Sequence, residues 1–307
     1  TTLSVALVAV EVGMRLVFGN ISLFHGLAVI MLAPEVFEPL RQVGAQFHAS
    51  ANGVTASRAA FDIIEQAQDV AAPGTSPCPD MTATAIVLDG VGVRARGAWG
   101  PAPTDGVIRP GTVTAFAGPS GAGKSTLVAC LLADVTPDAG RILLCPHASF
   151  PRGDDLALTD VDPVSWRSGL SWVPQSPTLI PGSILDNMGG LPLADLEEAA
   201  RATGFDAVLS TTPHGWESTI GVGGVGLSVG QRQRLALTRA LAARSQVVIL
   251  DEPTAHLDAV SEETVVRAIT TMREEGRTVI VIAHRSAVIG VADTIIDVAS
   301  AEEEALA

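Results

Sequence analysis

The 307-residue chain contains no Tyr, only three Cys and a single Lys, and aromatic residues make up 4% of it. Cys78, Cys130 and Cys145 are far apart and form no C-x-x-C pair, which argues against a disulfide scaffold or a zinc site and indicates a reducing compartment. We expect these thiols to be packing residues. Basic residues are also scarce, since 33 carboxylates outnumber 19 Lys and Arg residues. The resulting net charge of -14 disfavours a nucleic-acid partner.

Apolar residues, in contrast, are abundant. They make up 47% of the chain, and the mean hydropathy is +0.37, which excludes a disordered protein, while the length predicts about two domains. Two mostly apolar runs, residues 3–18 and 21–32, are separated by a Gly-Asn turn. A helix needs about 20 residues to cross a bilayer. We therefore interpret the runs as membrane spans, the first beginning before Thr1 and the second continuing toward Leu40.

Charged residues interrupt these apolar runs. Glu11 and Arg15 are one helical turn apart, and a lone charge at the bilayer centre costs about 2.5 to 3.5 kcal/mol. We expect the two side chains to neutralise each other, with a role in a substrate path as the alternative. His25, Glu35 and Glu38 follow, and we expect the two glutamates at the membrane edge. A helical hairpin in a soluble core is the other interpretation of both runs.

The composition changes twice along the chain. Residues 42–68 are more polar, with apolar residues at helical spacing, and residues 71–80 are rich in Pro. From residue 85 onward, strand-like runs alternate with helical ones, which predicts an α/β layer fold. We expect part of a membrane domain with a helical extension over residues 1–70, a linker over 71–84, and an α/β domain over 85–307. The runs in question are strands 86–88, 112–117, 247–250 and 278–283, and helix 231–243.

The clearest motif follows the strand at 112–117. It satisfies G-x-x-x-x-G-K-[ST] and opens an apolar helix at 127–132, which predicts a phosphate-binding loop. Backbone N–H groups of such a loop surround phosphate at a helix N-terminus, Lys124 reaches the β and γ oxygens, and the Ser125 hydroxyl can bind Mg²⁺. The single Lys thereby has a chemical role. The loop consists of Gly118, Pro119, Ser120, Gly121, Ala122, Gly123, Lys124, Ser125 and Thr126.

Nucleotide hydrolysis also needs a carboxylate for the metal and a group that activates water. The apolar run 247–250 ends in Asp251 and Glu252, which we assign as metal ligand and general base, respectively. Gln175 is a candidate metal ligand or water contact. His284, which follows the strand at 278–283, is a candidate hydrogen-bond donor to the γ-phosphate.

Two shorter patterns admit other functions. Residues 221–226 fit G-x-G-x-x-G, but no clear strand precedes them and no dinucleotide-type helix follows at once, so a Rossmann site is disfavoured. Residues 226–230 fit G-x-S-x-G, with Asp251 and His284 downstream in hydrolase order, but no clear strand leads to Ser228. Neither pattern explains Lys124.

The order of the motifs resembles that of ABC-transporter nucleotide-binding domains. Walker A is at 118–125, a Q-loop at Gln175, Walker B ends at Glu252, a D-loop covers 255–258 and His284 is the switch histidine. The resemblance covers about residues 85–301. It implies an α/β P-loop NTPase with a helical subdomain, bound to ATP and Mg²⁺, and preceded by α-helical transmembrane segments of a six-span exporter-type domain. The signature residues that it implies are Leu227, Ser228, Gly230 and Gln231, with Asp258 in the D-loop.

The family sandwiches ATP between two such domains, so the resemblance implies a dimer in which the signature contacts the partner's nucleotide. Three departures stand out. The position of the usual adenine-stacking aromatic is Ala95, which leaves Arg94, Arg96 or Trp99 as replacements. Val229 replaces a usual Gly in the signature. Val222 replaces the glutamate that exporters carry before it.

Residues 32–50 and 226–235 further resemble CydD-type subunits of bacterial thiol-reductant ABC exporters, which support cytochrome bd assembly. This resemblance implies a heterodimer with a CydC-type half-transporter among the lipids of the bacterial cytoplasmic membrane, with the ATPase domain in the cytoplasm. The implied cargo is a small thiol such as cysteine or glutathione, or heme. With all of its Walker residues present, we expect this chain's site to hydrolyse ATP. The alternative is an ABC ATPase without transport, soluble or DNA-associated, with a mechanical role.

Overall fold

The computed structural model of the chain describes residues 2–36, 39, 42–43, 53–54, 57–58, 61, 74–95, 97–146, 155–254 and 259–302. It divides the chain into two compact units, Thr1–Ala72 and Pro73–Ala307, each of which is described by itself. The domain limits expected at residues 70 and 84 remain predictions.

The first unit contains a helical hairpin. Helix α1 (Thr2–Val17) ends in a turn at Gly19, and residues 23–36 form the second helix. Gly26 lets the two helices approach closely, since a Cβ there would lie 2.9 Å from Leu16 and 3.2 Å from Val12. Both apolar runs are therefore helical as predicted. In the part of the chain that the structure describes, no helix is both long enough and apolar enough to cross a membrane.

Glu11 and Arg15 form the ion pair that their spacing predicts. Nε of Arg15 donates to Oε1 of Glu11 at 2.8 Å, and both side chains are 63% exposed within the hairpin. Exposed pairs at this spacing contribute about 0.3 to 0.5 kcal/mol in water. The pair thus neutralises two charges on an otherwise apolar helix.

Residues 74–84 belong to the second unit and pack against the rest of it. Ser76 forms a β-bridge with Val161, the backbone N–H of Cys78 donates to Oγ of Ser165 at 3.1 Å, and Met81 is buried. These contacts fix the entry of the chain into its first long strand.

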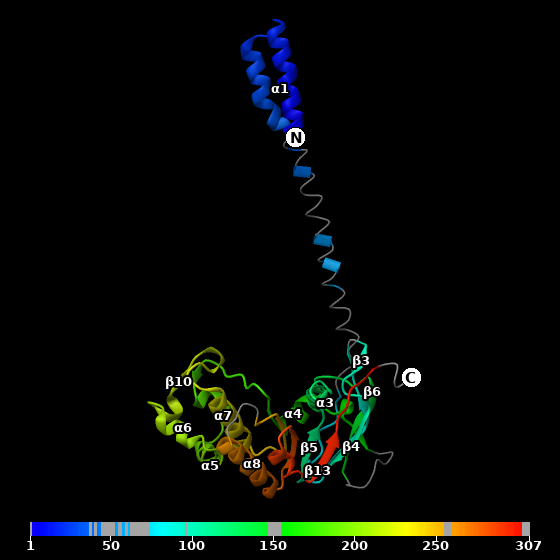
Figure 1. Ribbon diagram of the computed structural model, residues 1–307, viewed down its shortest axis with the longest axis vertical. Helices are drawn as coiled ribbons and strands as arrows, with labels where there is room; N and C mark the ends of the chain where they lie inside the picture. The colour runs from blue at the N-terminus through cyan, green and yellow to red at the C-terminus, as the bar shows by residue number, and fades with distance from the viewer. Residues whose placement is uncertain are drawn as a thin grey trace. The chain divides into compact units, whose positions relative to one another are not determined.

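A five-stranded parallel sheet forms the centre of the second unit (Figure 1). Two adjacent inner strands of this sheet are β11 (Val247–Asp251) and β12 (Thr278–Ile282). Every residue of these two strands is buried, as expected for a sheet covered on both faces. The order is β13-β5-β12-β11-β8, with β13 (Thr294–Asp297), β5 (Val113–Ala117) and β8 (Leu170–Val173).

An antiparallel sheet and α3 (Lys124–Leu131) build the first of two large cores. Leu127 and Leu131 of α3 pack with Phe116 of β5 and with the antiparallel strands. This sheet has the order β4-β1-β6-β7, with β1 (Ala85–Gly92), β4 (Thr104–Ile108), β6 (Ala139–Cys145) and β7 (Leu156–Ala157). A small third sheet, β14-β3-β2, joins β2 (Arg94–Ala95), β3 (Ala98–Trp99) and β14 (Ala301–Glu302).

The second large core is mainly helical and lies on the other side of the parallel sheet from these strands in Figure 1. Helices α5 (Leu193–Thr203), α7 (Val229–Ala242) and α8 (Ala259–Glu274) pack together through buried residues such as Leu196, Leu235 and Ile269. The shorter elements are α4 (Pro163–Ser168), α6 (Asp206–Thr211), α9 (Ser286–Ile289), β9 (Gly182–Ser183) and β10 (Thr219–Ile220). The predicted α/β fold with a helical part is confirmed.

Element limits differ from the predicted ones most at β1, which ends at Gly92 and not at residue 88, and at two helix starts. Helix α3 begins at Lys124, three residues before the expected start, because Gly123 adopts a left-handed conformation (φ 93°) that caps the helix. Helix α7 begins at Val229 instead of residue 231, because Ser228 caps it. Cys130 and Cys145 are buried, and burial raises the pKa of each thiol to about 11, which fits the predicted packing role.

Candidate functional site

The phosphate-loop residues form a tight turn between β5 and α3. Gly118, Gly121 and Gly123 have φ values of 146°, 82° and 93°, a region that side chains with a Cβ rarely adopt. At Gly118 a Cβ would overlap the carbonyl oxygen of Val298, and at Gly123 it would overlap the backbone of Gly100. Gly118 and Gly123 are therefore required for two reasons: their backbone conformation, and the close approach of another backbone segment to each of them.

Lys124 lies inside this turn and is 5% exposed. Its Nζ donates to the carbonyl oxygens of Gly118 at 2.9 Å and Pro119 at 2.8 Å. Burial lowers the pKa of Lys124, while the nearby carboxylates of Glu252 and Asp251 oppose that shift. The ammonium can exchange these carbonyl contacts for phosphate oxygens without leaving the loop, which agrees with its predicted role.

Ser125 and Asp251 supply two hard oxygen donors beside the loop. Asp251 ends β11 and is 8% exposed, and its burial raises the pKa of the carboxyl group, whereas a hydrogen bond with Ser125 lowers it. A hydroxyl and a carboxylate in contact fit Mg²⁺, which prefers oxygen ligands and keeps several waters or phosphate oxygens. The structure brings together both predicted ligands.

Glu252 follows Asp251 and holds a left-handed backbone conformation with φ 46°. Its Oε1 lies 3.0 Å from Nε2 of His284, and its Oε2 accepts a hydrogen bond from Nε2 of Gln175 at 2.9 Å. Non-Gly residues rarely adopt this conformation, and such strain clusters at functional sites. The two contacts fix both carboxylate oxygens, so the structure places the predicted base between the predicted Q-loop and switch residues.

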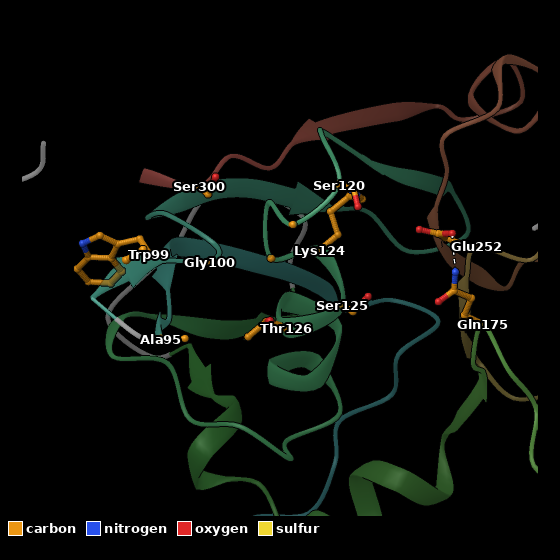
Figure 2. Close-up of a pocket in the computed structure, with 13 residues that line it drawn as sticks. Ala95, Trp99, Gly100, Ser120, Lys124, Ser125, Thr126, Gln175, Glu252 and Ser300 are labelled. Carbon is orange, nitrogen blue, oxygen red and sulfur yellow. Dashed lines mark hydrogen bonds between the residues drawn. The ribbon is translucent and has the colours of Figure 1, made fainter. Parts of the chain in front are cut away.

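Lys124, Ser125, Gln175 and Glu252 line a cavity of about 660 Å³, whereas Asp251 and His284 lie behind these residues and are not part of its lining. Figure 2 shows Lys124 and Ser120 near its middle, with Gln175 and Glu252 in contact on one side. Ala95, Trp99 and Gly100 are on the other side. The volume and the length of this arrangement suit a ligand with a phosphate chain bound at the loop and a second moiety beyond it.

The far end of the cavity includes the residues weighed for adenine contact. Ala95, Ala98 and Trp99 line it, and the guanidinium carbon of Arg94 lies 4.5 Å from the centre of the Trp99 ring. Trp99 itself is 6% exposed, so it packs against the protein as much as it faces the cavity. Arg96 lies outside the described residues. Ser300 also lines this end, and no signal in the sequence pointed to it.

The signature residues lie at the start of α7 and do not line this cavity. Ser228 Oγ accepts a hydrogen bond from the backbone of Gln231, whose Oε1 accepts one from the backbone of Ser228, a capping box. Leu227 is buried, whereas Val229, in place of the usual Gly, is 52% exposed, and Val222 is 78% exposed. The free N–H groups of this helix start are suited to an anion. Asp258 lies outside the described residues.

The two disfavoured patterns gain no support from these contacts. Ser228 is engaged with Gln231, and His284 is paired with Glu252, so the described contacts do not join them into a hydrolase triad. The G-x-G-x-x-G run forms a single 3-10 turn over Val222–Gly224 after the two-residue strand β10. Neither pattern has the strand-to-helix context that its chemistry needs.

Comparison with known proteins gives the family. Residues 103–255 match the family described as ABC transporter. This part of the chain belongs to the ABC transporter ATP-binding domains. The match covers the phosphate loop, the Q-loop residue Gln175, the signature and the Walker B carboxylates, so the resemblance inferred from the motif order is confirmed. ABC ATP-binding domains are ATP hydrolases, which agrees with the contacts of Glu252.

Curated relatives extend the similarity over most of the chain. The Bacillus subtilis protein named glutathione/L-cysteine transport system ATP-binding/permease protein CydC is 33% identical over 93% of this chain and 48% of its own length. The Haemophilus influenzae protein named glutathione/L-cysteine transport system ATP-binding/permease protein CydD is 31% identical over 93% of this chain and 49% of its own length. A Mycobacterium bovis fatty acid ABC transporter ATP-binding/permease protein is 32% identical over 94% of this chain and 45% of its own length. The chain spans about half the length of the curated relatives it matches.

A solved structure also supports the similarity to ABC exporters. A bacterial Atm1-family ABC exporter with ATP bound superposes with a TM-score of 0.68 at 25% identity, covering 99% of this chain and 54% of that one. Relatives named for thiol and for fatty acid transport have nearly equal identity to this ABC domain and its N-terminal unit. The similarity therefore supports an exporter ATPase more strongly than it supports any one cargo.

Proposed function

We propose that this chain is part of an ABC exporter half-transporter of the CydD type, and that its own Walker site hydrolyses ATP. The observation that carries the proposal is the carboxylate of Glu252, held by Gln175 and His284 beside a cavity lined by the phosphate loop. A carboxylate fixed at both oxygens is pre-oriented toward water at the end of a phosphate chain bound on Lys124.

In the proposed reaction, Lys124 binds β- and γ-phosphate oxygens while the loop N–H groups surround them. Ser125 and Asp251 would hold Mg²⁺, with Gln175 as a further candidate ligand, and the bound metal would supply positive charge beside the phosphates. Glu252 accepts a proton from water as the water oxygen bonds to the γ-phosphorus. The bond from that phosphorus to the bridging oxygen breaks, which gives ADP and phosphate. His284 positions Glu252 and donates to the γ-phosphate.

A second domain completes the site in this proposal. Ser228 and Gly230 at the start of α7 would contact the nucleotide held by the partner's Walker A, with Leu227 and Gln231 fixing that helix end. The relatives named CydC and CydD support a heterodimer with a CydC-type half-transporter. The D-loop residue Asp258 belongs to the same predicted interface.

The first unit is assigned to a membrane domain. Its hairpin exposes large apolar side chains on both helices, among them Leu7, Phe18, Phe24 and Leu32, which suits a lipid or helix-bundle environment. Relatives named as ATP-binding/permease proteins support a place in the bacterial cytoplasmic membrane with the ATPase domain in the cytoplasm. We propose a small thiol such as cysteine or glutathione as cargo, with heme as the alternative, in support of cytochrome bd assembly.

The non-transport alternative, a soluble or DNA-associated mechanical ATPase, is not favoured by these permease relatives or by the net charge of -14. Cell fractionation separates the two proposals. Recovery of the complete protein in the soluble fraction without detergent would overturn the exporter assignment.

The function is tested in inverted membrane vesicles that carry the complete heterodimer. We expect ATP-driven accumulation of labelled cysteine or glutathione, or of heme, and loss of that accumulation with Glu252→Gln. ATP turnover from this site should fall about 10² to 10⁴-fold, the usual contribution of a general base. Glu197→Gln, on the exposed face of α5, is the matched control. Unchanged turnover in Glu252→Gln would overturn the assigned base, and ATPase activity without accumulation would overturn the proposed cargo.

A further inference from the structure

The C-terminal end of the described chain runs from the start of the phosphate loop to the Trp99 end of the nucleotide cavity. Residues 298–302, here called the C-terminal strap, begin where the backbone N–H of Val298 donates to the carbonyl of Ala117 at 2.7 Å, directly before the phosphate loop. The carbonyl of Ala299 then accepts a hydrogen bond from Ala102 at 2.8 Å. The strap ends as β14, whose Ala301 pairs with Trp99 of β3. One short segment thus contacts both the strand that leads into the phosphate loop and the Trp99 end of the cavity.

The strap also packs directly against the phosphate loop. Gly118 lies so close to the Val298 carbonyl that a Cβ would overlap it, and Gly123 lies equally close to the backbone of Gly100. Gly100 directly follows β3, the strand that pairs with the strap. The loop is therefore packed between the strap on one side and the turn after β3 on the other, so these backbones have to fit together.

Ser300 is the polar side chain that the strap contributes to the cavity wall. It lines the cavity together with Ala95, Ala98 and Trp99, and Figure 2 shows it on the Trp99 and Gly100 side, away from Gln175 and Glu252. A nucleotide whose phosphates lie on the loop must direct its nucleoside toward this end. The hydroxyl of Ser300 can both donate and accept a hydrogen bond there, whereas Ala95 and Ala98 offer only small apolar surfaces.

We propose that the C-terminal strap is a structural part of the nucleotide site and that Ser300 contacts the nucleoside of the bound nucleotide. The inference rests on the proposed ATP-binding function and extends it to residues about 180 positions after the phosphate loop in the chain. Trp99, covered by Arg94 and paired with Ala301, forms the rigid wall against which the nucleoside lies.

The test compares two ligands on the purified full chain by calorimetric titration in the presence of Mg²⁺. ATP carries the nucleoside, whereas inorganic triphosphate binds only through the phosphate loop. We expect Ser300→Ala to weaken ATP binding roughly three- to tenfold, the loss of one hydrogen bond, and to leave triphosphate binding unchanged. Deletion of residues 301–307 removes β14 and should weaken ATP binding further. Ser210→Ala, an exposed serine of α6, is the matched control.

Each result decides the proposal. Unchanged ATP affinity in both variants would overturn it, and an equal loss of ATP and triphosphate affinity would overturn the nucleoside contact of Ser300. Failure of the proposed function itself looks different, because the unmodified chain would then bind neither ligand. Titration with 2′-deoxy-ATP and with GTP distinguishes a contact with the ribose from a contact with the base. An effect of Ser300→Ala that disappears with 2′-deoxy-ATP assigns the contact to the ribose, and one that disappears only with GTP assigns it to the base.

Discussion

Nε2 of His284 lies 3.0 Å from Oε1 of Glu252, and this contact joins the chain segments that follow two adjacent parallel strands, β12 and β11. The carboxyl ends of parallel strands meet at one edge of a sheet, so residues 32 positions apart come together there. The backbone N–H of Glu252 also donates to the carbonyl of Ile282 at 3.2 Å, which fixes the two segments to each other. Glu252 is therefore positioned by the sheet as well as by its side-chain partners.

We expect His284→Ala to lower kcat for ATP hydrolysis at least tenfold while KM changes little, because the histidine orients Glu252 more than it binds substrate. His284→Gln should recover part of kcat, since its amide keeps a hydrogen-bond donor near Oε1. Steady-state kinetics of both variants provide the measurement. Equal loss of activity in the two variants, with unchanged thermal stability, would argue that charge on the imidazole and not its positioning of Glu252 is what matters.

Gly121 and Gly123 offer a matched pair within one loop. Both have positive φ, but a Cβ at Gly121 would meet nothing within 4 Å, whereas one at Gly123 would overlap the backbone of Gly100. We expect Gly121→Ala to cost about 1 kcal/mol from conformation alone and to keep some nucleotide binding. Gly123→Ala should lose binding because the backbone has to move. Thermal unfolding and ATP titration of the two variants test this, and equal effects would show that conformation alone governs the loop.

The sequence allowed the Walker residues to be predicted because each one is read from local spacing. A Gly-rich run before Lys124, and two carboxylates after an apolar strand, are patterns within a few residues. Contacts between distant segments were not predictable in this way. Ser300 reaches the cavity only because β14 pairs with β3, and Val298 touches Gly118 only because β13 lies beside β5. Such pairings depend on sheet order, which no short motif encodes.

Helix starts were mispredicted for a related reason. Lys124 is a polar residue at the first turn of α3, so an apolar pattern alone places the start too late. The left-handed Gly123 and the capping side chain of Ser228 are what determine the two starts. The first turn of a helix is also where an anion can bind. The residues that apolar periodicity missed therefore include Lys124 and Ser125, which we propose to bind phosphate and Mg²⁺.

The capping box of α7 leads to a prediction about the partner site. Ser228→Ala removes the cap and should lower stability by about 1 kcal/mol. We expect ATP binding in this chain's own cavity to remain unchanged, since Ser228 does not line it, while ATPase activity of the assembled heterodimer falls. Asp162→Ala is the control, because Asp162 caps α4 by accepting a hydrogen bond from the backbone of Ser165 at 2.8 Å. Loss of heterodimer activity in the control as well would mean that reduced stability explains the effect.

The last prediction concerns Asp251, whose pKa is raised above the ordinary 3.8, chiefly by burial. A carboxyl group with a raised pKa binds its proton more tightly in the folded state than in the unfolded state. Stability therefore falls as the pH rises through the interval between the two pKa values, and the full destabilisation applies above both. The ionised form is nevertheless the one that can hold Mg²⁺. At neutral pH the charge of Asp251 thus lowers folding stability, and the same charge is what the proposed Mg²⁺ site needs.

Asp251→Asn should accordingly unfold at a higher temperature than the unmodified chain at pH 8, and this advantage should shrink as the pH is lowered through the raised pKa toward the ordinary 3.8. The same variant should lose Mg²⁺-dependent hydrolysis. Asp297→Asn is the matched control, because Asp297 also ends a strand of the parallel sheet but is exposed. Its unfolding temperature should follow that of the unmodified chain at every pH. If Asp251→Asn is less stable than the unmodified chain at pH 8, the hydrogen bond with Ser125 outweighs the cost of burying the charge, and the argument from burial fails.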